Sequence, residues 1–368
     1  MSSPVSRLLT CGAALAVVVL VGCARKSSPP RPEPVVTPVS ECTPALERKI
    51  GEGHTVDNLT VYPITSCAQA DPGPIVTLDE ALAKGSAVIR ELEGGGSVNT
   101  LAIENQGKVP VFVLAGTIVK GGKQDRQIGQ DYLIGALDKA TVDAFCVEHG
   151  RWNEKRDGKE TGGVFRVADV IATSKVRAAG QYEKNQGKVW AKVAETNAAN
   201  DKAPPSDTLL ASIDDATLAS ERDALAERLG RALANLPARQ SMVGFAYAID
   251  GEIKGARWFG HHRVYSMHEK KLLRSVALDA ALVKAEGKAK GTGAAVKSAP
   301  TPAAVEAFLS SVEQQAVKEE RDTSAANVNT YKESAKAYGS KMMMKPGTMA
   351  SASATGTAKA LSVDVTSK

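Results

Sequence analysis

MVGFAYAI (242–249), DG (250–251) and EIKGARWF (252–259) form the stretch of sequence that decides the fold. Asp-Gly between two runs rich in apolar residues is a strong signal for a two-residue type I′ turn, so the stretch predicts a β-hairpin. On its first strand, one predicted face carries Val243, Phe245, Tyr247 and Ile249, and the other carries Gly244, Ala246 and Ala248. The face of small residues predicts close packing of a helix, with an apolar stripe at Leu273, Val276, Ala280 and Val283.

Helical patterns also precede and follow this hairpin. Leucines recur on one face of a predicted helix at positions 218, 225, 229, 233 and 236. Val189 and Val193 mark a shorter amphipathic stretch, and residues 301–317 predict a further helix. Thr77 and Glu80 have the spacing of a capping box, which predicts a short helix through Lys84.

Three apolar runs predict further strands. Val98–Ile103 and Val109–Leu114 are separated only by Glu104–Lys108, so we expect them to form a second hairpin. Thr141–Val147 predicts another strand. Together these patterns predict an α+β fold, a mostly antiparallel sheet with packed helices, in a single globular domain over residues 46–345.

Two stretches lack the periodicity of a helix or a strand. Residues 286–300 are rich in Gly, Ala and Lys, and we expect a flexible insert there. Residues 346–368 consist mainly of Ala, Ser, Thr and Lys, which predicts a disordered tail.

The amino terminus has the pattern of an export signal. Arg7 is its one cation, an apolar run follows from Leu8 to Val21, and Gly22 and Cys23 end the run. This run is shorter than the roughly 20 apolar residues that span a bilayer. Its end resembles the lipobox of bacterial lipoproteins, which implies removal of residues 1–22 and a diacylglycerol on Cys23. The alternative is an ordinary signal peptide that is cut elsewhere.

A proline-rich tether is predicted between the anchor and the domain. Residues 24–40 contain five prolines among small polar residues, so we expect an extended spacer over residues 23–45. The lipid-anchored protein would lie in the cell envelope, and Ala24 after the lipid site favours the outer membrane over the inner one. Membrane lipid, bound through Cys23, is therefore one predicted partner.

The charge balance argues against a nucleic acid as a partner. The whole chain has a formal net charge of +5, but residues 23–285 contain 34 basic and 33 acidic residues. A nearly neutral body lacks the basic surface that binds a phosphate backbone. Export would also remove the chain from nucleic acid.

The cysteines outside the signal and the anchor are Cys42, Cys67 and Cys146. In an oxidising compartment Cys42 and Cys67 are candidates for a disulfide, because both flank the start of the domain. Cys146 lies in an apolar strand pattern, where a thiol usually fills the core. Its spacing from His149 is poor geometry for a thiol–imidazole pair.

Polar residues follow two predicted strands and form a candidate site. Lys123–Arg126 come after a double glycine, where backbone amides can turn toward an anion and Lys123 and Arg126 add charge. The loop is not a Walker motif, because Gln124 replaces the Mg²⁺-binding hydroxyl residue. We expect a pocket for a small anionic or nucleotide-like ligand, and its predicted residues are Lys123, Gln124, Arg126, Glu148, Arg151 and Trp152.

Three alternatives remain open for these residues. Glu148 could instead form a buried ion pair with Arg126 or Arg151 that fixes the strand ends. The chain could be an enzyme acting on a nucleotide or phosphorylated small molecule, with Glu148 as general base and Lys123 and Arg126 stabilising charge. It could also be a structural component of the envelope that binds no ligand.

Neither a metal nor a cofactor is expected. His261, His262 and His268, with Glu269 nearby, match no spacing of zinc ligands, and a solvated loop before a helix explains them.

Several motifs resemble one known family. Gly121–Arg126 and Cys146–Trp152 resemble the signature of the ADP-ribosylglycohydrolase- and rhodanese-phosphatase-associated protein domain, a domain of unknown function. Further similarities lie at Gln186–Trp190, in the Asp250-Gly251 hairpin, and at Lys271–Ala280. The resemblance covers about residues 58–283 and extends more loosely to 345.

The chain departs from the family pattern at two positions of these motifs. The family more often has Asn at the position of Asp125 and Tyr at that of Val276. The carboxylate of Asp125 puts a ligand contact carried over to that position in doubt. The family name implies an association with ADP-ribose chemistry and no specific activity.

Overall fold

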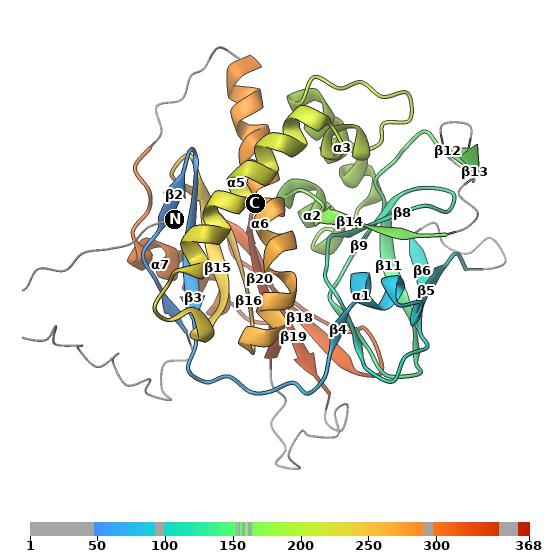
Figure 1. The fold of residues 1–368 in the computed structure, drawn as a ribbon, viewed down its shortest axis with the longest axis horizontal. Coiled ribbons are helices and arrows are strands. Elements are labelled where there is room, and N and C mark those ends of the chain that lie inside the picture. The colour runs from blue at the N-terminus through green and yellow to red at the C-terminus, as the bar shows by residue number, and fades with distance from the viewer. Residues whose placement is uncertain are drawn as a thin grey trace, which may run out of the picture. The chain divides into compact units, whose positions relative to one another are not determined.

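The computed structural model describes residues 48–92, 99–151, 153, 155–156, 159–160, 164–289, 291, 297–345 and 360–368. They form an α+β fold of helices and mainly antiparallel sheets, as predicted (Figure 1). The predicted signal peptide, Cys23, the tether and Cys42 lie outside the described residues.

The largest sheet contains nine strands in the order β1-β3-β15-β16-β20-β19-β18-β17, with β2 paired to β3. Its strands are β1 (Lys49–Ile50), β2 (His54–Val56), β3 (Leu59–Thr65), β15 (Met242–Ile249), β16 (Glu252–Phe259), β17 (Glu319–Asp322), β18 (Asn327–Glu333), β19 (Ala337–Met344) and β20 (Ala360–Ser367). All of these pairings are antiparallel. We call this sheet the main sheet.

The hairpin at the centre of the sequence analysis is confirmed. β15 and β16 pair from Ile249↔Glu252 outward, and the turn residues Asp250 and Gly251 have φ values of 49° and 75°. Positive φ at both central residues is the requirement of a type I′ turn, which Asp-Gly meets at low cost.

The prediction of which face receives the following helix is wrong. α6 (His262–Ala289) packs on the face of Phe245 and Tyr247, whose rings fill the space beneath it. The small residues Ala246 and Ala248 instead contact α7 (Pro302–Glu313). Val243 lies in the same core cluster as Ala246 and Ala248. The β15–β3 register shifts between Met242 and Gly244, and this irregularity interrupts the alternation of side chains between the two faces of the strand.

Two further sheets lie beside the main sheet in Figure 1. One has the order β14-β8-β9-β11-β6-β5, and the other has the order β10-β7-β4. Their strands are β4 (Val76–Thr77), β5 (Ala87–Arg90), β6 (Thr100–Asn105), β7 (Val111–Val113), β8 (Thr117–Lys120), β9 (Arg126–Ile128), β10 (Tyr132–Ile134), β11 (Lys139–Cys146) and β14 (Arg166–Ile171). The short strands β12 (Lys155–Arg156) and β13 (Lys159–Glu160) pair with each other. The predicted strand at Thr141–Val147 is thus confirmed as most of β11.

The predicted hairpin between the runs at 98–103 and 109–114 is wrong. β6 pairs with β5 and β11, whereas β7 pairs with β10 and β4. The side-chain amide of Asn105 donates to the carbonyls of Val109 and Gly135, at 2.9 and 2.7 Å. These bonds turn the chain after β6 and direct β7 into a different sheet.

The remaining helices pack between these sheets and over the main sheet. They are α1 (Leu78–Ala83), α2 (Ser174–Gln181), α3 (Gln186–Ala199), α4 (Leu210–Ile213) and α5 (Ala216–Ala234). The capping box is confirmed, since the Thr77 hydroxyl accepts from the Glu80 amide and the Glu80 carboxylate accepts from the Thr77 amide. The predicted leucine face of α5 packs against α6 in the largest core cluster.

The end of the chain corrects two predictions. Residues 360–367 are not part of a disordered tail but form β20, which lies between β16 and β19 with Leu361 and Val365 buried. β-branched residues within this otherwise small, polar segment supply the strand preference. The predicted insert at 286–300 begins later than expected, because α6 continues through Ala289. Residues 346–359 lie outside the described residues.

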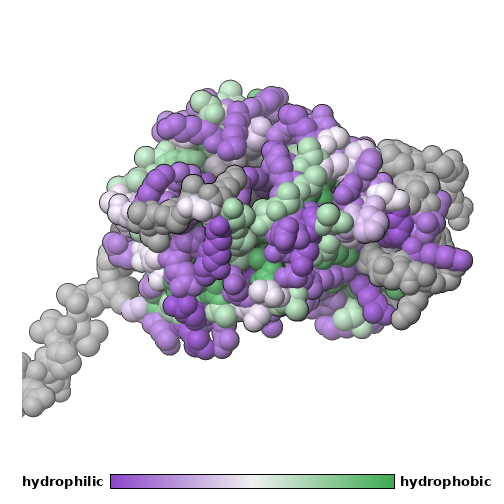
Figure 2. All heavy atoms as spheres, turned by 90° about the horizontal axis from the view of Figure 1, so that it is seen from above, coloured by the Kyte–Doolittle hydropathy of each residue, from purple (hydrophilic) through white to green (hydrophobic). Residues whose placement is uncertain are grey.

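The face of the molecule seen in Figure 2 is predominantly polar. In the view from above, hydrophilic side chains dominate, and hydrophobic atoms are exposed mainly near the middle (Figure 2). The helices in the described ranges are all too short or too polar to traverse a lipid bilayer.

Candidate functional site

Three motif segments that are distant in the sequence meet at the end of β8, β9 and β11. The side chain of Gln186 closes a pair of hydrogen bonds with the backbone of Cys146, at 2.9 and 2.8 Å. The rings of His149 and Trp190 lie edge to face, with centroids 4.4 Å apart. Gln124 donates to the His149 carbonyl at 3.5 Å. We call this region the motif cluster.

Carboxylates of the protein itself occupy the backbone amides of the double-glycine loop. The Gly121 amide donates to Asp125 at 3.0 Å, the Lys123 amide to Glu91 at 3.3 Å, and the Asp125 amide to Glu148 at 3.3 Å. A loop of this kind can bind an external anion when its amides point outward. Here the amides expected to contact an anion are directed at internal acids.

Two buried arginines neutralise these acids. Arg151 donates to Glu148 through Nε at 2.9 Å, and its Nη2 lies 2.8 Å from the same carboxylate and 3.6 Å from Asp125. Arg126 donates to Glu91 at 2.9 Å. Asp125, Arg126 and Glu148 are at most 2% exposed. Of the two pairs considered for Glu148, the structure contains the one with Arg151, while Arg126 pairs with Glu91.

The double glycine is needed for close packing. Gly121 has a φ of +139°, and a Cβ there would lie 2.2 Å from the Val164 carbonyl oxygen. At Gly122, with φ +55°, a Cβ would lie 2.4 Å from the ring of Phe165. The loop therefore requires glycine at both positions whether or not it binds an anion.

The predicted ligand residues differ in their placement. Gln124, Arg126, Glu148 and Arg151 are brought together but buried in the motif cluster. Lys123 is exposed at its edge. Trp152 lies outside the described residues.

Two further groups bear on the motif cluster. Sequence reasoning missed Glu91, although its place directly after the strand Ala87–Arg90 was a usable signal. Cys146 is buried and forms no disulfide, and burial raises its pKa more than neighbouring Arg126 lowers it. These surroundings fit a core thiol, because a raised pKa disfavours the nucleophilic thiolate.

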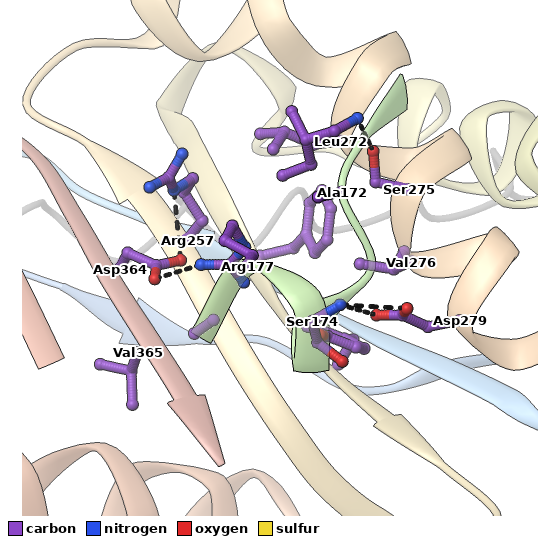
Figure 3. A pocket seen from close by; sticks show the side chains of 14 residues that line it. Ala172, Ser174, Arg177, Arg257, Leu272, Ser275, Val276, Asp279, Asp364 and Val365 are labelled. Carbon is purple, nitrogen blue, oxygen red and sulfur yellow. Dashed lines mark hydrogen bonds and ion pairs between the residues drawn. The ribbon is translucent and has the colours of Figure 1, made fainter. Parts of the chain in front are cut away.

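A second cluster of buried charges surrounds an internal cavity of about 30 Å³ (Figure 3). Arg177 of α2 donates to Asp364 of β20 at 2.5 Å, and Nε of Arg257 on β16 lies 3.2 Å from the same carboxylate. Arg257 also donates to Asp131 at 3.2 Å. All four side chains are at least nine-tenths buried. We call them the central cluster.

The central cluster continues as a polar row across the main sheet. Arg257 is opposite Asp364, Asp364 is opposite Ser340, and Ser340 is opposite Tyr331 in the strand registers. Asp131 also accepts from the Ala115 amide at 2.7 Å and from the Ser362 hydroxyl at 2.6 Å.

Within the described residues, Nη1 of Arg257 and Nε of Arg177 lack a hydrogen-bond partner. The adjoining cavity is large enough for about two water molecules.

The family motif at 271–280 lines this cavity with Leu272, Ser275, Val276 and Asp279. Asp279 accepts from the amide of Ser174 at the start of α2, with both oxygens 3.2 Å away. Burial raises the pKa of Asp279 to about 6. Val276 contributes only apolar surface, so no ligand contact is assigned to it.

A second hollow, much larger than the central cavity, is a groove of about 970 Å³ on the α7 side of the main sheet. We call it the α7 groove, and its lining includes Arg48, Ser66, Ala68, Trp258, Glu306, Glu313, Thr330, Lys332, Lys341, Met343 and Val363. Trp258 is opposite Val363, which is opposite Lys341, which is opposite Thr330. Residues in register share a face of the sheet, so these four form the groove floor.

The histidines do not gather into a metal site. His262 begins α6, and His268 is buried on it, stacked on Phe259 with ring centroids 5.4 Å apart. The expectation of a solvated loop is therefore wrong for His268, whose pKa burial lowers to about 4. Across the described ranges, no group of three or more His, Cys, Asp or Glu is placed to hold a metal ion.

Comparisons with known proteins give one result. Residues 47–355 match the profile of the ARG and Rhodanese-Phosphatase-superfamily-associated Protein domain, which is the family suggested by the motifs. Searches of curated proteins and of solved structures give no match. The matched region contains the motif cluster, most of the α7 groove, and the central cluster except for Asp364. Because the matched region spans most of the sequence, the chain belongs to the ARG and Rhodanese-Phosphatase-superfamily-associated Protein domain family.

Proposed function

We propose that this chain is a lipid-anchored protein of the cell envelope that binds a small anionic ligand in the α7 groove. The observation that carries the proposal is the groove itself, whose volume of about 970 Å³ is comparable to that of ligand sites. The motif cluster is a weaker candidate because its charges are buried and engaged with one another.

The charges of the α7 groove favour an anion. Its two carboxylates, Glu306 and Glu313, both accept from Arg48, at 2.6 and 2.5 Å. Lys341 is exposed and forms no ion pair with the described residues. Lys332 donates to the Glu313 backbone carbonyl at 2.5 Å. Among the described residues that line the groove, three cations therefore stand against two carboxylates, which leaves one excess positive charge.

The groove floor also supplies groups that orient a ligand. Thr330 stands opposite Lys341 and adds a hydroxyl beside the ammonium group. Trp258, Val363 and Met343 provide adjoining apolar surface. A ligand with one anionic end and a compact apolar or sugar-like body matches this combination, since binding sites pair apolar walls with a few placed polar groups.

A thermal-shift series on the mature lipoprotein in detergent tests the ligand. The compounds are inorganic phosphate, sugar phosphates, nucleotides and cell-wall fragments, and a compound that binds the folded state raises its melting temperature. We expect Lys341→Glu to abolish the shift, because it replaces the attracting charge with a repelling one. Lys108→Glu is the matched control, since Lys108 is also exposed but lies outside the groove. An unchanged shift in Lys341→Glu would exclude the groove as the site.

Metabolic labelling tests the anchor independently. Acylation at Cys23 predicts incorporation of labelled palmitate and fractionation with membranes, because two or more acyl chains hold a protein stably at a bilayer. Cys23→Ser should remove the label and release the protein. Retained label in Cys23→Ser would contradict the anchor, while leaving the ligand experiment valid.

A further inference from the structure

One end of the α7 groove is built around a single cation, the guanidinium group of Arg48. This group lies 4.8 Å from the centre of the Trp258 ring. Glu306 accepts from its Nε and Nη2 at 3.2 and 2.6 Å, and Glu313 accepts from its Nη1 and Nη2 at 2.5 and 2.7 Å. An aromatic ring with carboxylates beside it is the chemistry by which proteins recognise guanidinium and ammonium groups. We call Trp258, Glu306 and Glu313 the cation site.

The carboxylates of the cation site outnumber the cation that they bind. Both accept from Arg48, so these three groups together have one excess negative charge. The hydrogen bond from Arg48 lowers the pKa of Glu306, which is therefore ionised at neutral pH. Lys332 donates to the Glu313 backbone carbonyl. The side chains of Glu306 and Glu313 are 43% and 41% exposed, so a ligand in the groove can reach them.

Arg48 is held in this site mainly by its side chain. It directly precedes β1, a two-residue strand at the edge of the main sheet that pairs with β3. Short segments at a sheet edge fray at low free-energy cost. Withdrawal of the Arg48 side chain would expose the Trp258 ring and both carboxylates to the groove that all of them line.

We propose that the cation site binds the guanidinium or ammonium group of a ligand, and that Arg48 occupies the site as an intramolecular competitor when no ligand is bound. The other end of the ligand rests on the proposed function, which places an anionic group at Lys341. Trp258 and Lys341 are two strands apart on the groove floor, with Val363 between them, and this separation is roughly 10 Å. The ligand class is therefore a zwitterion whose charged ends lie roughly that far apart.

Competition by Arg48 has a measurable consequence. A cationic ligand binds only the fraction of molecules from which Arg48 has withdrawn, so removal of Arg48 increases the apparent affinity. If Arg48 instead formed a permanent structural ion pair, the wild-type protein would bind no cation at this site.

Calorimetric titration of the mature lipoprotein in detergent tests the cation site. The probe is pentylguanidinium, which has the cation and no anionic group. We expect wild type to bind it weakly and Arg48→Ala to bind it several-fold more tightly. Adding Glu306→Gln and Glu313→Gln to Arg48→Ala should reverse this gain, because both acceptors lose their charge. Adding Glu227→Gln instead is the matched control, since Glu227 is 68% exposed on α5.

Three results would overturn the cation site. The first is equal affinity in wild type and Arg48→Ala, which would show that Arg48 does not compete. The second is binding by Arg48→Ala but not by wild type, which would make Arg48 a permanent partner of the two carboxylates. The third is binding by neither protein. Arg48→Gln replaces Arg48→Ala in these comparisons if the alanine variant folds poorly.

The anionic end of the ligand is tested separately with ε-guanidinocaproate, which is pentylguanidinium with a carboxylate added to its chain. We expect wild type to bind it more tightly than pentylguanidinium, and Lys341→Gln to remove this difference. If the groove binds no anion, Lys341→Gln changes neither affinity, and the competition with Arg48 remains. If the cation site is wrong, pentylguanidinium shows no competition with Arg48, while anionic compounds still raise the melting temperature.

Discussion

The motif cluster and the central cluster are both groups of buried arginines and acids, but they are assembled differently. In the motif cluster, Arg151 pairs with Glu148 three residues away, and its Nη1 donates to backbone carbonyls of Gly122 and Asn153. In the central cluster, Arg177 and Arg257 share Asp364, which lies more than 100 residues later in the sequence. The charged residues of the first come from residues 91–151, whereas those of the second span residues 131–364.

This difference predicts how each cluster responds to the loss of an acid. Arg151 retains backbone acceptors when a carboxylate is removed, so part of its hydrogen bonding survives. Arg177 and Arg257 lose their common acceptor at Asp364, and Nη1 of Arg257 already lacks a partner among the described residues. A buried charge without a counter-ion is the costlier outcome.

The largest effect is expected for Asp364→Asn. It leaves buried Arg177 with a neutral acceptor in place of Asp364 and Arg257 with Asp131 as its remaining carboxylate, so we expect the free energy of unfolding to fall by about 3–5 kcal/mol. Urea denaturation measures this change. Asp322→Asn is the control, because Asp322 is 73% exposed and its pair with Lys345 should contribute at most about 1 kcal/mol. Equal losses in the two variants would contradict the role of Asp364.

A somewhat smaller effect is expected from the titration of Asp279. Its pKa is raised to about 6 in the folded state, so the proton stabilises the fold, and this stabilisation is lost as pH rises from about 4 through 6. Asp279→Asn keeps an oxygen acceptor for Ser174 and removes the titration. We expect the free energy of unfolding of the variant, relative to that of wild type, to increase by about 2–3 kcal/mol between pH 4 and pH 7. A difference that does not change with pH would refute the raised pKa.

Glu148→Gln should have a smaller effect than Asp364→Asn. The amide can still accept from the Asp125 backbone, and Arg151 keeps its backbone carbonyls, so we expect a loss of about 1–3 kcal/mol. Combining it with Arg151→Gln should cost less than the sum of the single changes, because each alone leaves an unpaired charge. Additive losses would show that the pair is not coupled.

The smallest effect is expected for Gly121→Ala. Its φ of +139° and the nearby Val164 carbonyl strain any side chain, and we expect a loss of about 1–2 kcal/mol in chemical denaturation. Gly187→Ala is the control, because its position in α3 meets only an ordinary 3.4 Å contact and alanine favours helix. Similar stabilities for the two variants would remove the packing argument for the loop.

Local patterns explain how much of the fold could be predicted from sequence. The Asp250-Gly251 turn and the Thr77 capping box depend on neighbouring residues, and both predictions are confirmed. The separation of β6 from β7 depends on Asn105 reaching the carbonyl of Gly135, and no periodicity encodes that contact. β20 is not predicted because its β-branched residues Val363, Val365 and Thr366 lie in a tail whose overall composition is typical of disorder.

The same division applies to the candidate sites. Motif spacing predicted that Arg126 and Glu148 approach one another at the strand ends, but not that Glu91 completes the network. The central cluster and the α7 groove each need β20, a strand that the sequence analysis did not predict. Their residues come from segments whose contacts depend on the order of strands in the main sheet.

The position of β20 in the main sheet constrains when the protein can finish folding. β16 and β19 each pair with β20 along one side. β20 is synthesised about 100 residues after β16 and about 15 residues after β19. Until then both strands expose an edge, and open edges invite pairing between chains. A nascent polypeptide would thus keep an incomplete main sheet through most of its synthesis. A premature stop before Ala360 would leave such edges permanently open and favour aggregation.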